Sequence, residues 1–197
     1  MLKSSRIIAV DMDEVLFPLL RPMLRHTKIK QPESSKYPYN YSVVMDRPRE
    51  EAQQVLYDYY DSKEFNHVLP IHGTLNVINR FKKNGYDLYL VTGRQARVRD
   101  KTEEWLNYWF PNTFKDIILT DSYTSKEVSK VDVCKNIGAG LIIDDSYETC
   151  VRCLDEGVSV INYIGFPVYP WCEHNELSTC SWYDIEKRFF DGSPVPF

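Results

Sequence analysis

The chain has 197 residues, 43% of them hydrophobic, and a formal net charge of −4 at pH 7. This length suffices for one domain, or for one domain with an insertion, and the composition can supply a real core. The slight negative charge argues against a general nucleic-acid-binding surface without ruling out nucleic acid as a partner. No apolar run approaches the roughly 20 residues that span a membrane.

The N-terminal segment leads directly into an apolar run and leaves no room for the apolar segment and cleavage site of a signal peptide. We therefore expect a cytoplasmic, reducing location, in which the five cysteines do not form a disulfide framework. Cys150 and Cys153 could be a redox pair, but positions i and i+3 share one side of a helix, and we expect a helix face there. A metal could be held by Cys172, His174 and Cys180, but one mixed cluster without a paired second half is a weak signal for a metal site.

The first expected element is a buried parallel strand over residues 6–10, which runs into two acidic residues, Asp11 and Asp13. Burying a carboxylate there is costly unless a cation or hydrogen-bond donors meet it. The carboxyl edge of an open α/β sheet is also where such sheets bind ligands. Two acids one residue apart also occur in surface turns and calcium loops, so other segments must identify the site.

The regular pattern is interrupted between residue 17 and about residue 70, a stretch rich in proline. A helix is expected over residues 49–60, where apolar residues recur at the spacing of one helical face. No strand is evident. We therefore predict an α/β core over residues 1–16 and 71–197 and an inserted, mostly helical cap over residues 17–70.

Strands and helices alternate in the rest of the chain, which implies a parallel sheet with right-handed crossovers. We predict a Rossmann-like α/β fold with a sheet of about five strands flanked by helices. The remaining strands are expected over residues 86–92, 116–120, 141–145 and 158–163. The remaining helices are expected over residues 73–84, 97–110, 131–137, 146–156 and 181–190.

Two later strands also end in polar residues, namely Thr92-Gly93-Arg94 and Asp144-Asp145. Because parallel strands end at one edge of the sheet, these groups can meet Asp11 and Asp13. Four carboxylates at one edge repel each other unless a cation lies among them, and hard oxygen ligands suit Mg²⁺. The hydroxyl and backbone N–H groups after the second strand can hold phosphate oxygens, and Lys130 can add a positive charge.

Taken in order, these residues resemble the four motifs of the haloacid-dehalogenase-like superfamily. The first motif is an apolar strand followed by two acids, here Asp11 and Asp13. The second is a Thr or Ser after the next strand, here Thr92, and the third is a Lys that opens a helix, here Lys130. The fourth is an acidic pair after an apolar strand, here Asp144-Asp145. The resemblance ties together most of the chain.

The resemblance implies a phosphomonoester hydrolase that acts through an aspartyl-phosphate intermediate. Asp11 would attack phosphorus, which splits one difficult step into two. Asp13 would protonate the leaving oxygen and then help a water molecule to attack the intermediate. Because a dehalogenase of this family does not need the second acid, the presence of Asp13 favours phosphate transfer to water.

The resemblance also implies a Mg²⁺ site and a phosphate site. The metal would be held by Asp11, the backbone carbonyl of Asp13 and Asp144, with Asp145 as a contact through water or a supporting group.

Thr92 and Lys130 would bind the transferred phosphoryl oxygens, and the backbone of Gly93 and Arg94 could also touch phosphate. Lys126 is an alternative to Lys130, which has the better spacing to the fourth motif. The Arg94 side chain could bind substrate or cover the surface, and the sequence does not decide between the two.

Within the superfamily, the insertion resembles a C1-type cap. The segments 61–65, 69–73 and 117–120 resemble the 5′(3′)-deoxyribonucleotidase group. This resemblance implies a small phosphorylated substrate, with a nucleoside monophosphate as the first candidate. Phe17 is our candidate for stacking on a base. Three further tyrosines could stack too, but we expect them in the core of the cap: Tyr37, Tyr39 and Tyr41.

Two other classes of function stay open. The protein could be a phosphatase for sugar phosphates, nucleic-acid ends or phosphoprotein, although a cap that closes the cleft disfavours bulky substrates. It could instead be a non-catalytic protein that keeps the fold and uses its pocket for binding, against which the complete set of acids argues. The sequence does not indicate an oligomeric state.

Overall fold

The computed structural model describes residues 5–190, whose sheet has six parallel strands in the order β3-β2-β1-β4-β5-β6. The predicted Rossmann-like α/β fold is confirmed. Five strands correspond to predicted ones, whereas the two-residue β6 is too short to produce a periodic signal in the sequence. The strands are β1 Ile7–Val10, β2 Asp87–Thr92, β3 Phe114–Leu119, β4 Leu141–Asp144, β5 Ser159–Tyr163 and β6 Ser178–Thr179.

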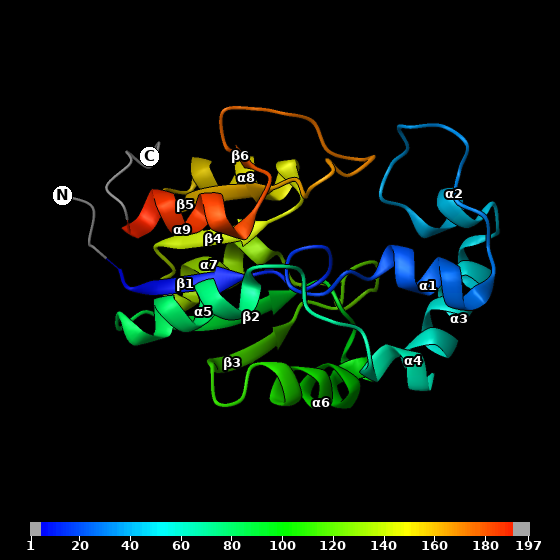
Figure 1. The fold of residues 1–197 in the computed structure, drawn as a ribbon, viewed down its shortest axis with the longest axis horizontal. Helices are drawn as coiled ribbons and strands as arrows, with labels where there is room; N and C mark the ends of the chain where they lie inside the picture. Colours follow the sequence, from blue (N-terminus) through cyan, green and yellow to red (C-terminus); the bar gives the residue numbers. More distant parts are fainter. Residues whose placement is uncertain (1–4, 191–197) are drawn as a thin grey trace.

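Helices cover both faces of the sheet (Figure 1). Successive strand residues point to opposite faces. Accordingly, Ile8 and Val10 belong to one buried cluster, with α5, α6 and α9, while Ala9 belongs to a second, with α7 and α8. These helices are α5 Thr74–Lys83, α6 Arg99–Trp109, α7 Lys130–Ile137, α8 Tyr147–Asp155 and α9 Trp182–Phe190, and a 3₁₀ turn, Ala96–Val98, precedes α6.

Residues 17–70 form helices beyond the carboxyl ends of the strands, at the right of Figure 1. The stretch contains four helices, and its α3 has the expected bounds. The chain leaves and re-enters the sheet region at one place, because Ile71 N–H donates to Leu16 O at 2.9 Å. The helices of this insertion are α1 Leu20–Thr27, α2 Tyr41–Met45, α3 Arg49–Tyr60 and α4 Lys63–Asn66.

The strand register sets which residues meet at the carboxyl edge of the sheet. Val10 pairs with Leu90 of β2 and with Ile143 of β4. Asp11 continues this ladder, since its N–H donates to Ile143 O at 2.9 Å. The residues that follow β1 therefore lie between the ends of β2 and β4.

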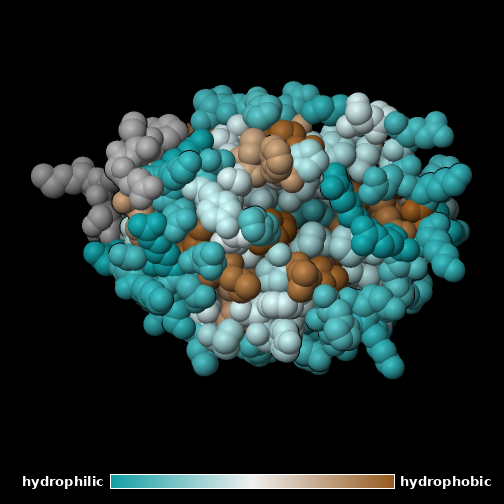
Figure 2. Space-filling model, in the orientation of Figure 1, coloured by the Kyte–Doolittle hydropathy of each residue, from teal (hydrophilic) through white to brown (hydrophobic). Residues whose placement is uncertain are grey.

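The surface in the orientation of Figure 1 is mostly hydrophilic, with separate hydrophobic patches (Figure 2). Cys150 and Cys153 are buried on one face of α8, as expected for a helix face, and both are free thiols. Among the described residues, no helix is both long enough and apolar enough to cross a membrane.

Candidate active site

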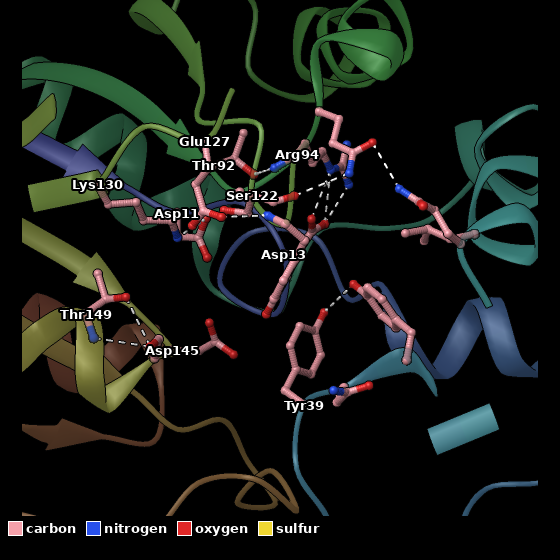
Figure 3. Close-up of a pocket in the computed structure, with 18 of the residues that line it drawn as sticks. Asp11, Asp13, Tyr39, Thr92, Arg94, Ser122, Glu127, Lys130, Asp145 and Thr149 are labelled. Carbon is pink, nitrogen blue, oxygen red and sulfur yellow. Dashed lines mark hydrogen bonds and ion pairs between the residues drawn. The ribbon is translucent and has the colours of Figure 1, made fainter. Parts of the chain in front are cut away.

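The residues predicted for the site line one pocket, with the exception of Phe17. The pocket has a volume of about 460 Å³ and lies between the carboxyl edge of the sheet and the insertion (Figure 3). The predicted residues in its wall are Asp11, Asp13, Thr92, Gly93, Arg94, Lys130, Asp144 and Asp145. A volume of this size suits a small molecule.

Lys130 lies between two buried carboxylates. Its Nζ is 2.9 Å from Asp11 Oδ1 and 2.7 Å from Asp144 Oδ2. The lysine is the first residue of α7, where the Ser129 side chain accepts a hydrogen bond from a backbone N–H and fixes the start of the helix. Burial alone would lower the pKa of Lys130, but the two carboxylates raise it, so the ammonium stays charged. The alternative lysine, Lys126, is exposed and does not line the pocket.

Asp145 points into the same space from the residue after β4. Its Oδ2 accepts from Trp171 Nε1 at 2.9 Å, a contact that the sequence did not reveal because Trp171 lies 26 residues further along the chain. Asn162 Nδ2 donates to the backbone carbonyls of Asp144 and Asp145 at 3.3 and 3.0 Å. The strand end that carries both acids is thus fixed by its neighbours.

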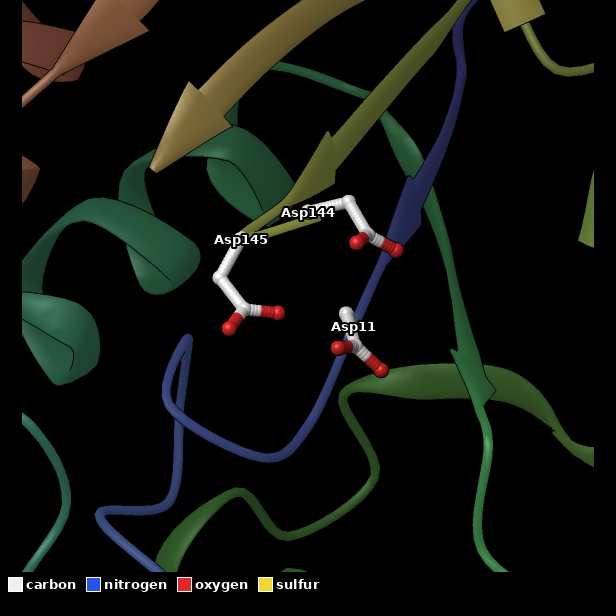
Figure 4. A group of neighbouring side chains, drawn as sticks. All are labelled: Asp11, Asp144 and Asp145. Carbon is white, nitrogen blue, oxygen red and sulfur yellow. The ribbon is translucent and has the colours of Figure 1, made fainter. Parts of the chain in front are cut away.

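One oxygen from each of Asp11, Asp144 and Asp145 lies within 4.8 Å of the others (Figure 4). All three residues are buried, and burial raises the pKa of Asp11 to about 7, with Lys130 opposing the change. Burial likewise raises the pKa of Asp145. Three desolvated carboxylates share one lysine, so the cluster lacks positive charge. An all-oxygen donor set of this kind fits a hard divalent cation such as Mg²⁺.

The carboxylate of Asp13 lies outside this cluster and is held by Arg94 (Figure 3). Arg94 Nη2 is 2.7 Å from Asp13 Oδ1, and Nε is 3.1 Å from Oδ2. The third donor group, Nη1, donates to Thr102 Oγ1 at 3.1 Å. A contact between Arg94 and substrate stays a prediction, since Arg94 lines the pocket, but the Arg94 side chain does not cover the surface. It is buried and binds a neighbouring acid.

Thr92 and Gly93 border the pocket beside Asp11. Arg94 N–H donates to Thr92 Oγ1 at 3.3 Å, and Ser122 N–H donates to Gly93 O at 3.1 Å. A Cβ atom at Gly93 would lie 3.0 Å from Ser122 Oγ, which is closer than an ordinary van der Waals contact. Glycine therefore lets the loop after β3 approach the pocket.

The prediction that Phe17 offers a face to a base is wrong. Its side chain has an exposed fraction of 0% and does not line the pocket. The ring stacks on Phe65, with centroids 4.8 Å apart, and meets the edge of Trp105 at 5.0 Å. Because Met12 O accepts hydrogen bonds from Leu16 and Phe17 N–H at 2.8 Å, the loop after β1 turns back and directs the ring inward.

The three tyrosines expected in the core of the cap do pack against the hydrophobic core, and two of them also line the pocket. Tyr39 and Tyr41 are half-buried, and their hydroxyl oxygens are 3.2 Å apart (Figure 3). The residue between them, Asn40, is the N-cap of α2 and accepts from Ser42 and Val43 N–H. This cap fixes the turn that brings both rings to the pocket.

A further polar cluster in the pocket wall joins the insertion to the loop after β2. Tyr57 of α3 donates its hydroxyl hydrogen to Gln95 Oε1, and Gln53 Nε2 donates to Tyr57 Oη at 2.9 Å and to Gln95 Oε1 at 3.3 Å. The sequence could not reveal this cluster, because glutamines on a helix and in a loop give no signal of their contact.

Cys172 and Cys180 are not gathered with His174 into a metal site. Across residues 5–190, the only group of three or more His, Cys, Asp or Glu side chains arranged to share an ion is the aspartate cluster. Cys172 Sγ instead donates to Asp145 O at 3.6 Å. Its contribution is to pack the loop after β5 against the site.

No family model and no curated protein matches the chain. Solved structures match its fold over nearly the whole length. A predicted phosphatase from Clostridium acetobutylicum aligns with a TM-score of 0.67 and 15% identity, covering 94% of this chain and 98% of the other. A haloacid dehalogenase-like hydrolase from Streptococcus pneumoniae aligns with a TM-score of 0.65 and 12% identity, covering 93% and 97%.

A third structure is a HAD-family hydrolase from Deinococcus radiodurans with bound phosphate and sodium. It aligns with a TM-score of 0.61 and 11% identity, covering 95% of this chain and 96% of the other. At such identities the likeness establishes a shared fold, and residues 5–190 have the fold of haloacid-dehalogenase-like hydrolases.

Proposed function

We propose that this protein is a haloacid-dehalogenase-like phosphatase that hydrolyses a small phosphomonoester through an aspartyl-phosphate on Asp11. The observation that carries the proposal is the convergence of Asp11, Thr92, Lys130 and Asp144 in one pocket of about 460 Å³. The four residues come from separate segments of the chain, and their combination of nucleophile, hydroxyl, cation and metal ligand matches what phosphoryl transfer requires.

In the first step, a carboxylate oxygen of Asp11 attacks phosphorus while the bond from phosphorus to the leaving oxygen breaks. Asp13 gives its proton to that leaving oxygen. In the second step, a water molecule transfers a proton to Asp13 and attacks phosphorus, and the bond to Asp11 breaks. The products are phosphate and the leaving alcohol, and both aspartates return to their starting forms.

Lys130 and Thr92 bind the oxygens of the transferred group in this proposal. Lys130 Nζ already lies 2.9 Å from the attacking carboxylate, so one ammonium can contact both reacting partners. Thr92 lines the same pocket as Asp11. The backbone around Gly93 borders the same space, which supports our expectation that it contacts phosphate.

Asp11, Asp144 and Asp145 would hold Mg²⁺, and the backbone carbonyl of Asp13 stays our expected fourth protein ligand. Bound there, the ion supplies positive charge that screens the nucleophile from the phosphate anion and stabilises charge developing on the phosphoryl oxygens. Trp171 and Asn162 orient the two acids after β4. The identity of the metal as Mg²⁺ rests on the hard, all-oxygen donor set.

We further propose that residues 17–70 act as a C1-type cap and that a nucleoside monophosphate is the preferred substrate. The insertion side of the pocket offers the rings of Tyr39 and Tyr41 for contact with a base, and stacking on such rings contributes about 1–3 kcal/mol per base. The amides of Gln53 and Gln95 can pair with polar edges. A cytoplasmic location stays a prediction from the sequence.

A phosphate-release panel with Mg²⁺ tests these proposals. It compares nucleoside monophosphates, sugar phosphates, a phosphopeptide and a 5′-phosphorylated oligonucleotide, with Asp11→Asn as the inactive control. We expect the highest kcat/KM for a nucleoside monophosphate. Preference for a sugar phosphate or an oligonucleotide end would overturn the nucleotide assignment alone. Binding of Mg²⁺ and phosphate without release from any compound would overturn the enzymatic proposal.

A further inference from the structure

Arg94 is the most completely enclosed cation near the pocket. Its side chain is 1% exposed, against 15% for the side chain of its partner Asp13. Burial alone would lower the pKa of the guanidinium, but the facing carboxylate raises it, so the charge is kept. Burying the Arg94 charge is costly unless a partner compensates it, and that partner is Asp13.

Aromatic rings surround the guanidinium on the sides that Asp13 does not occupy. Its central carbon lies 4.8 Å from the ring centroid of Phe17, 5.0 Å from that of Tyr60 and 5.3 Å from that of Phe65. Tyr60 and Phe65 belong to the insertion. Cation–π contacts and the hydrogen bond to Thr102 therefore fix Arg94 between the sheet and the insertion, and Arg94 in turn fixes Asp13.

The geometry at Asp13 leaves one oxygen available. Oδ1 accepts from Nη2 at 2.7 Å and from Nε at 3.2 Å, whereas Oδ2 accepts only the 3.1 Å hydrogen bond from Nε. Asp13 lines the pocket. Oδ2 is thus the oxygen that retains capacity for a proton and for contact with the leaving group.

We propose that Arg94 is a positioning residue that holds the Asp13 carboxyl in the orientation needed to protonate the leaving oxygen. This inference rests on the proposed function, because it assigns Arg94 a role only if Asp13 is the acid. The insertion then helps to position the acid, because two of the rings that hold Arg94 come from α3 and α4.

The test uses two substrates that differ in their need for an acid. An alkyl phosphate releases a poor leaving group that must be protonated, whereas 4-nitrophenyl phosphate releases a stable anion. The measured quantity is kcat/KM, which covers the steps up to leaving-group departure and omits the later attack of water. Arg94→Lys keeps the positive charge but loses the paired Nε and Nη2 donors that hold the Asp13 carboxylate. We expect kcat/KM to fall about 100-fold for the alkyl phosphate and less than about 3-fold for 4-nitrophenyl phosphate.

Two companion variants interpret the result. Asp13→Asn must show the same selective loss, and if it does not, the proposed role of Asp13 fails independently of Arg94. Arg97→Lys is the matched control, since Arg97 lies in the adjoining 3₁₀ turn and its guanidinium covers the ring of Tyr57 at 4.1 Å without reaching Asp13. We expect both substrates to be turned over normally by this control.

Equal losses for the two substrates in Arg94→Lys, with Asp13→Asn still selective, would overturn the inference and leave Arg94 a structural residue. A gain with the alkyl phosphate would also overturn it, because the ion pair would then be restraining Asp13. If Arg94→Lys does not fold, Thr102→Val removes the hydroxyl that holds Nη1 and should produce a smaller loss of the same selectivity. Thr102→Ser keeps the hydroxyl and should lose no activity toward either substrate. Equal losses of kcat/KM for the two substrates in Thr102→Val would contradict the inference.

Discussion

At the scale of single residues, Lys130 has the clearest role. Among the described residues, it alone forms ion pairs with both Asp11 and Asp144. Because both carboxylates are buried and the Lys130 side chain is only 15% exposed, their mutual attraction is screened less than at the surface. Removal of the lysine leaves two carboxylates without their protein cation.

Lys130→Met should lower kcat/KM for the preferred phosphomonoester by about 10²–10³, the loss typical of removing one group that stabilises developing charge. Lys126→Met, at an exposed position outside the pocket, is the matched control and should retain activity. The measurement is steady-state phosphate release with a parallel thermal melt. Normal phosphate release by Lys130→Met together with reduced release by Lys126→Met would reverse our assignment of the phosphate lysine.

The sequence correctly places Asp11, Thr92 and Asp144 at one edge of the sheet, because each ends or follows a recognisable buried strand and parallel strands end at one edge. The sequence does not reveal how the side chains of Phe17 and Arg94 are oriented. Their side-chain directions depend on a tight turn at Met12 and on rings that come from distant helices, and neither has a local pattern.

At the scale of elements, Glu14 connects the loop after β1 to the first helix of the insertion. It is buried, has a φ of 61°, and its Oε1 accepts from Leu20 N–H at 2.7 Å. Leu20 is the first residue of α1, whose N-cap residue supplies no side-chain hydrogen bond. The carboxyl of Glu14 therefore satisfies a helix N-terminus that would otherwise lack a partner.

Glu14→Ala should lower the free energy of unfolding by about 1–2 kcal/mol, because the N–H of Leu20 loses its acceptor. Glu14→Gln should be close to the wild type, since an amide oxygen can accept the same hydrogen bond. Both replacements keep a side chain at positive φ, so backbone strain cancels in the comparison. Urea unfolding measures the difference, and equal stability of the two variants would remove the capping role.

Sequence patterns predict the long, regular helix of the insertion but not its shorter elements. The helical face of α3 is regular, and its bounds are predicted correctly. In α1, Leu20, Met23 and Leu24 are buried at helical spacing, but the helix has only eight residues and contains Pro22 in its first turn, so the signal is short and interrupted. β6 has two residues and is ordered by pairing with β5.

At the scale of the whole molecule, the fold concentrates negative charge. The parallel sheet brings one carboxylate oxygen from each of Asp11, Asp144 and Asp145 within 4.8 Å of the others, and Lys130 offsets only part of their charge. The native state should therefore bind a divalent cation that the unfolded chain binds weakly, and such binding adds stability.

Addition of Mg²⁺ should raise the melting temperature, with a gain of about 2.7 kcal/mol at a concentration 100 times the Kd. Chelation should stop turnover and Mg²⁺ should restore it, whereas Ca²⁺, with its looser coordination, should inhibit. Asp144→Asn should abolish the Mg²⁺-dependent shift, and Glu173→Gln, at an exposed acid outside the pocket, is the control that should keep it. Activity that is indifferent to chelators would mean that the aspartate cluster does not serve as a metal site.

The central claim is that Asp11 becomes phosphorylated during turnover, and the most direct measurement is acid quenching of the reaction within the first turnovers, followed by mass spectrometry of the peptide that contains Asp11. We predict the added mass of one phosphoryl group on Asp11 in the wild type and none in Asp11→Asn, whose turnover should fall by several orders of magnitude while its melting curve stays cooperative. Rapid phosphate release by Asp11→Asn, or a phosphoryl group carried by any other residue, would contradict the account.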